Sequence, residues 1–159
     1  MTFVFFQLLL KIKNVKFIAN MKIKNGKILS IDLKQMDPIN NTNFILGNFT
    51  ETKIKKDISN YFENKIDIIV SDMAQNTTGN KNLDSLITGE LCLDALNFAK
   101  DIINKNGFFV SKIFMGSNFK EIIDKARNIF KDVKIFKPKS SRKEYNKNKT
   151  FSLSKNSKT

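Results

Sequence analysis

The sequence has no histidine and only one cysteine, and each shortage excludes a class of site. Without histidine the chain cannot form a Ser-His triad, a histidine general base or a histidine metal site. The single cysteine, Cys92, can form neither an internal disulfide nor a cysteine zinc site. Its place inside an expected helix is typical of a small core residue rather than a nucleophile. A reducing cytoplasm is therefore the natural setting for this chain.

Long apolar runs are also missing. Residues 1–11 hold the most apolar stretch, MTFVFFQLLLK, which is too short to span a bilayer. It has no positive amino-terminal region and no small-residue cleavage site, so a signal peptide is not expected. We expect a buried strand or a short helix here, and no membrane partner.

The 159 residues are 41% hydrophobic and 27% charged, which is typical of one folded domain covering 1–159. The net charge of +13 indicates a polyanionic partner such as nucleic acid, although an A+T-biased genome also enriches lysine. Residues 137–159 carry eight Lys or Arg and one Glu, more than half of the net charge. This basic tail predicts phosphate contacts, but it could also be an unstructured, solubilising end, which we expect beyond Asn146.

Strands and helices alternate along the chain at a spacing typical of a parallel, doubly wound α/β sheet. Apolar runs predict strands, and 3.6-residue periodicity predicts helices with an apolar face. We expect the helix that contains Leu86, Leu93 and Leu96 to end with a left-handed cap at Asn106-Gly107. The expected strands are 27–33, 43–49, 66–72, 108–115 and 133–136, with a last edge strand at 150–153, and the expected helices are 50–64, 86–104 and 118–130.

Asp72 ends the expected buried strand Ile66–Asp72 and precedes a loop of small polar residues, QNTTGN. Ligands of open α/β sheets bind beyond the carboxyl ends of the strands, which is where Asp72 would lie. The simpler alternative is that Asp72 caps the next helix or turn, and this stretch alone favours that alternative.

Lys112 lies in the middle of an otherwise apolar strand, and Asp32 ends another. Burial disfavours a charged amine, so a buried lysine needs a partner or a task. Lys112 could act on a substrate proton, in its neutral form or held by Asp72, or it could be an edge-strand lysine that reaches solvent. Asp32 could hold ribose hydroxyls, as acids at this position do in Rossmann-like sheets, or it could be a turn residue.

Five segments together resemble the FtsJ-like ribosomal RNA 2′-O-methyltransferases in order and spacing. They are IDLKQMDPI, ILGNFT, SDMAQNTTGNKNLDS, FFVSKIFMG and KPKSSRKE, within residues 26–144. The resemblance implies a Rossmann-like methyltransferase sheet with a final antiparallel strand. It also implies S-adenosylmethionine-dependent methylation of a uridine ribose 2′-hydroxyl in large-subunit ribosomal RNA.

The resemblance assigns roles to particular residues. Family catalysis uses a Lys-Asp-Lys-Glu set, in which Asp72 matches the Asp and Lys112 the second Lys. Asp32 matches the acid that holds the cofactor's ribose, and Asn48 stands where an Asp near the adenine is usual; Asp72 also borders the cofactor. The expected RNA contacts are Lys137, Lys139, Arg142 and Lys143.

The sequence departs from the family in two regions. Its six glycines are isolated, so the glycine-rich cofactor loop is missing. The family's first strand and first catalytic Lys are absent or replaced by residues 1–25, which carry no resemblance. In the tail of residues 145–159, Lys147 falls at the place of the catalytic Glu, and Glu144 lies three residues too early. The fold is thus expected to be incomplete at its amino end, with impaired activity.

Two functions follow, both for a cytoplasmic monomer. The first is the methyltransferase, acting on ribosomal RNA or the large subunit. The second is a non-catalytic RNA-binding remnant of such an enzyme. Only the first requires S-adenosylmethionine binding, so the cofactor separates them. A methyltransferase with another substrate is a weaker third interpretation.

Overall fold

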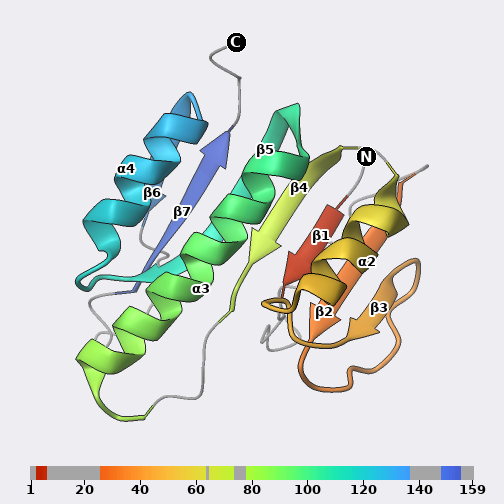
Figure 1. Cartoon of the computed structure of the whole chain (residues 1–159), viewed down its shortest axis with the longest axis horizontal. Coiled ribbons are helices and arrows are strands. Elements are labelled where there is room, and N and C mark those ends of the chain that lie inside the picture. The colour runs from red at the N-terminus through yellow and green to blue at the C-terminus, as the bar shows by residue number, and fades with distance from the viewer. Residues whose placement is uncertain (1–2, 7–25, 64, 74–77, 137–147, 155–159) are drawn as a thin grey trace.

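The computed structural model describes residues 3–6, 26–63, 65–73, 78–136 and 148–154. These form a seven-stranded sheet in the order β3-β2-β1-β4-β5-β7-β6 (Figure 1). The strands are β1 (Phe3–Phe6), β2 (Ile28–Asp32), β3 (Asn43–Leu46), β4 (Ile66–Ser71), β5 (Ile103–Phe114), β6 (Asp132–Phe136) and β7 (Asn148–Ser154). Neighbouring strands from β3 to β5 are parallel. The mixed sheet, with helices alternating with strands, is the α/β fold that the sequence predicts.

Strand β7 lies between β5 and β6 and is antiparallel to both. The prediction of an edge strand at 150–153 was therefore wrong in position, since β7 pairs along both sides. The expectation of an unstructured chain beyond Asn146 was also wrong for residues 148–154. The position of a terminal strand within a sheet is difficult to predict from sequence, because the strand pairs with residues far away in the sequence.

Strand β1 occupies the middle of the sheet, between β2 and β4. Its sequence FVFF is continuously apolar, as expected for a parallel strand with neighbours on both sides. The apolar amino end thus supplies a strand, as one of the two sequence alternatives for it expects. No helix among the described residues is long and apolar enough to cross a membrane.

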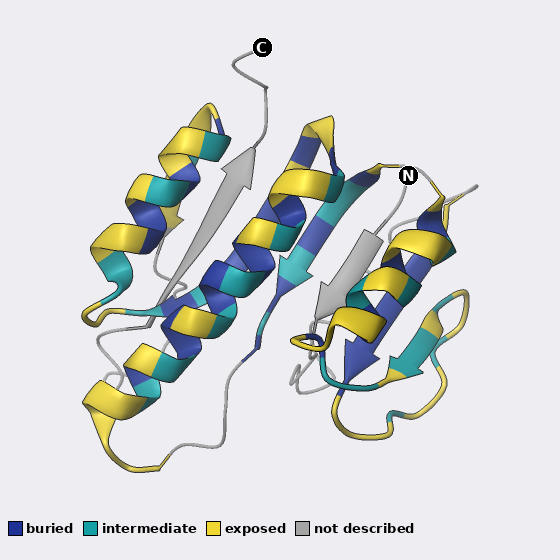
Figure 2. Cartoon of the chain, viewed as in Figure 1, coloured by how far each residue is buried: buried dark blue, intermediate teal, exposed yellow. Residues whose placement is uncertain are grey.

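The helices of the described residues cover one face of the sheet (Figures 1 and 2). They are α2 (Thr52–Phe62), α3 (Lys81–Ile102) and α4 (Phe119–Ile129). Their apolar faces pack on the sheet, and α4 buries Ile122, Ile123 and Ala126, as its periodicity predicts. The fully buried centre of this layer contains large side chains from strands and helices alike, including Ile58, Ile69, Leu96, Phe109 and Phe130.

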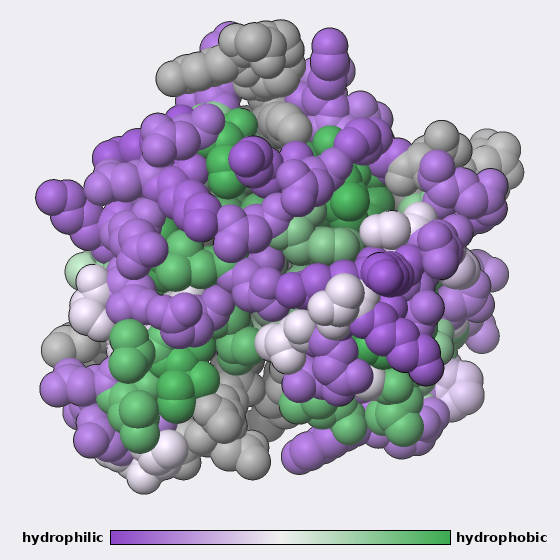
Figure 3. Space-filling model, in the orientation of Figure 1, coloured by the Kyte–Doolittle hydropathy of each residue, from purple (hydrophilic) through white to green (hydrophobic). Residues whose placement is uncertain are grey.

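Helix α3 differs from its prediction at both ends. It begins at Lys81, and Leu86, expected on the buried face, is 41% exposed beside Leu83 at 42%. An apolar patch lies where α3 begins, at the lower left of Figure 3. At the other end, Ile103 already belongs to β5, and Gly107 has no left-handed φ. Glycine is needed there for space, because a Cβ would lie 2.9 Å from the Asp67 carbonyl oxygen.

Candidate functional site

Lys112 and Asp72 meet at the carboxyl ends of two neighbouring parallel strands. The Lys112 Nζ donates a hydrogen bond to Asp72 Oδ1 at 2.6 Å. The side chains are 29% and 18% exposed, so the pair is partly buried but reachable from solvent. The Lys112 amine also lies 5.8 Å from the centre of the Phe114 ring. An acid and an amine from adjacent strand ends thus lie together, and Asp72 holds Lys112, which is one of the alternatives that the sequence leaves open.

The end of the β4–β5 ladder explains how the pair forms. The last paired residues are Ser71 and Ser111, so Asp72 and Lys112 are the next residues of each strand. The Ser111 hydroxyl donates to the Cys92 sulfur of α3 at 3.3 Å and therefore faces the helices. Alternation along a strand then directs Lys112 to the opposite face. Strand β5 lies inside the sheet, so Lys112 is not an edge-strand lysine.

Asp72 does not cap the following helix. The cap of α3 is Asn80, whose side-chain oxygen accepts hydrogen bonds from the Asn82 and Leu83 backbone N–H groups at 3.1 and 3.3 Å. The alternative that Asp72 caps the next helix is therefore wrong. Asn80 ends the QNTTGN loop, and an Asn before an apolar helical pattern is the sequence signal that could have identified it.

A second network holds the loop where it joins α3. The Thr78 backbone N–H and hydroxyl both donate to Asp84 Oδ1 at 2.8 Å, and the Asn80 N–H donates to the Thr78 hydroxyl at 3.2 Å. These bonds favour the ionised carboxylate, so the backbone N–H of Thr78 first, and then its hydroxyl, lowers the pKa of Asp84. Sequence reasoning did not identify Asp84, although an acid in the first turn of a helix is a recognised signal.

Asp32 ends β2 at the same edge of the sheet and is only 6% exposed. Its Oδ1 accepts a hydrogen bond from the Lys34 N–H at 2.9 Å, which is the geometry of a turn-forming aspartate. One oxygen of this carboxylate therefore forms a turn, as the turn alternative for Asp32 expects. A buried acid held by a turn at the end of the second strand is also suitably placed to accept ribose hydroxyls.

Asn48 follows β3, and its Oδ1 accepts hydrogen bonds from the Thr50 N–H at 3.1 Å and hydroxyl at 2.9 Å. The backbone donor fixes the orientation of the amide. Within the part of the chain that the structure describes, Asn48 Nδ2 donates to no acceptor. An adenine ring nitrogen is an acceptor that this donor could bind.

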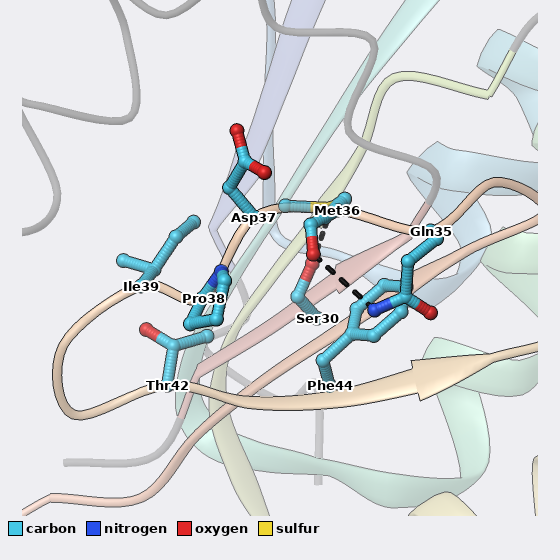
Figure 4. A pocket seen from close by; sticks show the side chains of 8 residues that line it. All are labelled: Ser30, Gln35, Met36, Asp37, Pro38, Ile39, Thr42 and Phe44. Carbon is cyan, nitrogen blue, oxygen red and sulfur yellow. Dashed lines mark hydrogen bonds between the residues drawn. The ribbon is translucent and has the colours of Figure 1, made fainter.

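A cavity of about 140 Å³ lies under the proline-containing loop after β2 (Figure 4). The loop side chains of Met36 and Pro38 close over Ser30 of β2 and Phe44 of β3. Its volume is well below the roughly 300–1,000 Å³ typical of pockets for drug-sized ligands. The expected cofactor and catalytic residues do not line this cavity.

Cys92 lies in the core, and burial raises the pKa of its thiol to about 12. This fits the expectation of an inert core residue rather than a nucleophile. The expected RNA contacts Lys137, Lys139, Arg142 and Lys143 lie outside the described residues, as do Glu144 and Lys147.

Comparison with known proteins connects this geometry to a family. The model of the FtsJ-like methyltransferase family matches residues 5–155. A ribosomal RNA large subunit methyltransferase E from Pelagibacter ubique is 52% identical over 122 residues, covering 77% of this chain and 60% of the relative. The protein of the same name from Rickettsia akari is 42% identical over 120 residues, covering 76% of this chain and 53% of the relative. The chain thus spans between half and two thirds of the length of these curated relatives.

The fold is found in solved structures as well. A crystal structure described as a ribosomal RNA methyltransferase from Plasmodium falciparum superimposes with a TM-score of 0.81 at 27% identity. The superposition covers 97% of this chain and 85% of that one. The Rossmann-like methyltransferase sheet expected from the sequence is therefore confirmed.

Proposed function

Because this chain belongs to the FtsJ-like methyltransferase family, we propose that it methylates a ribose 2′-hydroxyl of large-subunit ribosomal RNA with S-adenosylmethionine. The Lys112–Asp72 pair at the carboxyl edge of the sheet is the observation that carries this proposal. Only RNA offers a 2′-hydroxyl, so the proposed chemistry selects RNA over DNA. The finer proposal, taken from the family resemblance, is a uridine of the 23S-type RNA, modified by a monomer in the cytoplasm.

The residues present fit the proposed cofactor at two positions. The Asp32 carboxylate has one oxygen bound by its own turn and would accept ribose hydroxyls with the other. Asn48 would donate its amide N–H to the adenine. S-adenosylmethionine, when bound, supplies a methyl group already activated by a sulfonium, so the protein must align the acceptor and remove its proton.

Lys112 and Asp72 would perform that second task. A lysine ammonium has three N–H donors, and one of them is directed at Asp72. The others can hold the 2′-oxygen, which fixes its lone pair for in-line attack. Asp72 would take the hydroxyl proton directly, or it would take a proton from the Lys112 ammonium, which then accepts the hydroxyl proton.

The isolated glycines favour a second candidate, a non-catalytic RNA-binding protein that keeps the sheet and the basic tail. Isothermal titration of the purified chain with S-adenosylmethionine separates the two candidates. Binding at micromolar affinity, with transfer of labelled methyl groups to ribosomal RNA or large subunits, supports the enzyme. Absence of cofactor binding, with RNA binding retained, would refute the enzyme and leave the second candidate.

A further inference from the structure

We propose that Ser85 and Gly116 are positioning residues that hold Lys112 against Asp72, an inference that rests on the proposed role of Lys112. Gly116 lies four residues after Lys112, in the turn between β5 and α4. Ser85 lies in the second turn of α3. Neither residue touches the Lys112–Asp72 hydrogen bond, so their role would be exerted through the end of strand β5.

The contact between Ser85 and Gly116 leaves no room for a side chain. A Cβ at Gly116 would lie 1.6 Å from Ser85 Oγ and 2.7 Å from Ser85 Cβ, and real Cβ atoms do not approach other heavy atoms so closely. Among the described residues, Gly79 is the only glycine with a left-handed φ, so the φ of Gly116 is not left-handed. Glycine is thus required at position 116 for space and not for backbone conformation.

This contact belongs to a seam of small side chains along α3. The Ser111 hydroxyl meets the Cys92 sulfur at 3.3 Å, and a Cβ at Gly89 would lie 3.1 Å from the Asn118 Cβ. The Asn118 amide donates to Glu90 Oε1 at 2.8 Å. All of these contacts join the end of β5, or the turn that follows it, to the part of α3 between Ser85 and Cys92. These contacts, which we call the seam, therefore hold the end of β5 and its following turn against the first three turns of α3.

Lys112 needs such fastening because it lies beyond the β4 ladder. Pairing of β5 with β4 stops at Ser111, whereas pairing with β7 continues to Phe114. At Lys112, β5 therefore has no backbone pairing with β4, the strand that Asp72 follows. Lys112 lies between two seam contacts, one at Ser111 and one at Gly116, so the seam fixes the backbone from which its side chain extends.

The size of Ser85, rather than its hydroxyl, is the property that matters for this role. The hydroxyl is buried and has no hydrogen-bond partner in the described part of the chain, which is unfavourable for stability. Replacement by alanine would remove that hydroxyl but keep the Cβ. Replacement by glycine would open the space that a side chain at position 116 needs.

The test measures the position of Lys112 directly, in the whole chain. Each variant is acylated with limiting acetic anhydride, and labelling of Lys112 is measured by peptide mass spectrometry against Lys134, an exposed lysine of β6. We expect Gly116→Ala to raise Lys112 labelling by about threefold, the factor expected for loss of a partly exposed ion pair. We expect Ser85→Gly combined with Gly116→Ala to restore wild-type labelling, and Ser85→Ala combined with Gly116→Ala to fail.

Gly107→Ala is the matched control, since a Cβ at Gly107 would also be crowded, 2.6 Å from the Ile103 side chain, but Gly107 precedes the segment of β5 that is paired on both sides. It should lower the melting temperature without changing Lys112 labelling. Unchanged labelling in Gly116→Ala, an equal rise in Gly107→Ala, or no restoration in the Ser85→Gly double variant would each overturn the proposal. If Gly116→Ala does not fold, the double variant alone must fold and protect Lys112.

Methyl transfer supplies a second readout. If the wild-type chain is active, Gly116→Ala should lower kcat more than it raises KM. The double variant, Ser85→Gly combined with Gly116→Ala, should restore kcat. If the wild-type chain transfers no methyl group, the proposed function fails, while the labelling series still decides whether Ser85 and Gly116 position Lys112.

Discussion

The Lys112 ammonium and the Asp72 carboxylate lie 2.6 Å apart although forty residues separate them in the sequence. Their strands are hydrogen-bonded neighbours, and neighbouring strands are only about 4.8 Å apart. Each residue follows the last position at which β4 and β5 pair, so the pair forms as a direct consequence of the β4–β5 register. Such a pair at the carboxyl edge of an α/β sheet lies where ligands of this architecture bind.

Removal of either partner should stop the proposed reaction. We expect Lys112→Met and Asp72→Asn each to lower kcat for methyl transfer by about 10²–10⁴-fold, the range for loss of a positioned acid-base group. S-adenosylmethionine affinity, measured by titration, should change little in Lys112→Met. Lys55→Met is the matched control, because Lys55 pairs with Asp94 at 2.5 Å between α2 and α3. Full activity in Lys112→Met would rule out a role for this amine.

Cofactor affinity should depend on the charge of Asp32. Hydrogen bonds to a charged group contribute about 1.5–3 kcal/mol, so Asp32→Asn should weaken S-adenosylmethionine binding by roughly 10- to 100-fold. The amide keeps an acceptor for the Lys34 N–H, so the turn and the melting temperature should be preserved. Asp37→Asn, at an exposed acid of the following loop, should leave the Kd unchanged. Equal weakening in both variants would contradict a ribose-binding role.

The stability of the folded protein at acid pH should depend on the ionisation of Asp84. Hydrogen bonds from Thr78 lower its pKa below the ordinary value of 3.8, so the folded state binds the proton less readily than the unfolded state. This stabilisation is complete above pH 3.8 and is lost as the pH falls through the lower folded-state value. Urea titrations should show Asp84→Asn less stable than wild type at neutral pH, with the difference shrinking below pH 3.8. A pH-independent difference would show that the charge of Asp84 does not contribute.

The Cys92 thiol should be inert while the protein is folded. Burial raises its pKa from 9.0 to about 12, so near pH 8 its thiolate fraction is about a thousandfold lower than that of an unfolded chain. Because the folded state retains the proton, this group makes folding less favourable as the pH rises from 9 to 12. Reaction with a disulfide reagent should be slow in buffer and fast in denaturant. Rapid native-state reaction would mean that the core opens at α3.

RNA affinity should fall steeply with added salt if the basic tail contacts phosphates. Each such contact contributes about 0.7 to the salt-dependence slope for single-stranded RNA. Alanine at Lys137, Lys139, Arg142 or Lys143 should lower the slope by that amount, as measured by filter binding at several salt concentrations. Lys65→Ala is the control, because Lys65 precedes β4 at the opposite edge and donates to the Asp101 carbonyl. A salt-independent affinity would exclude the tail as a phosphate clamp.

Sequence alone was enough to establish the α/β class and most of its elements. Apolar runs and 3.6-residue periodicity are local properties, so strands such as Ile66–Ser71 and the buried face of α4 were predicted close to their observed bounds. The position of Asp72 at the end of a buried strand followed from the same patterns. The absence of histidine by itself excludes a histidine general base.

Only the tertiary structure decided how these elements meet. Strand β7 entered between β5 and β6 rather than at the edge, and Leu86 proved exposed while α3 packed through Ser85, Gly89 and Cys92. Strand order and close packing depend on contacts between residues far apart in sequence, which local periodicity does not encode. For the same reason, the hydrogen bond between Lys112 and Asp72 and the crowding of Gly116 by Ser85 were decided only when the chain folded.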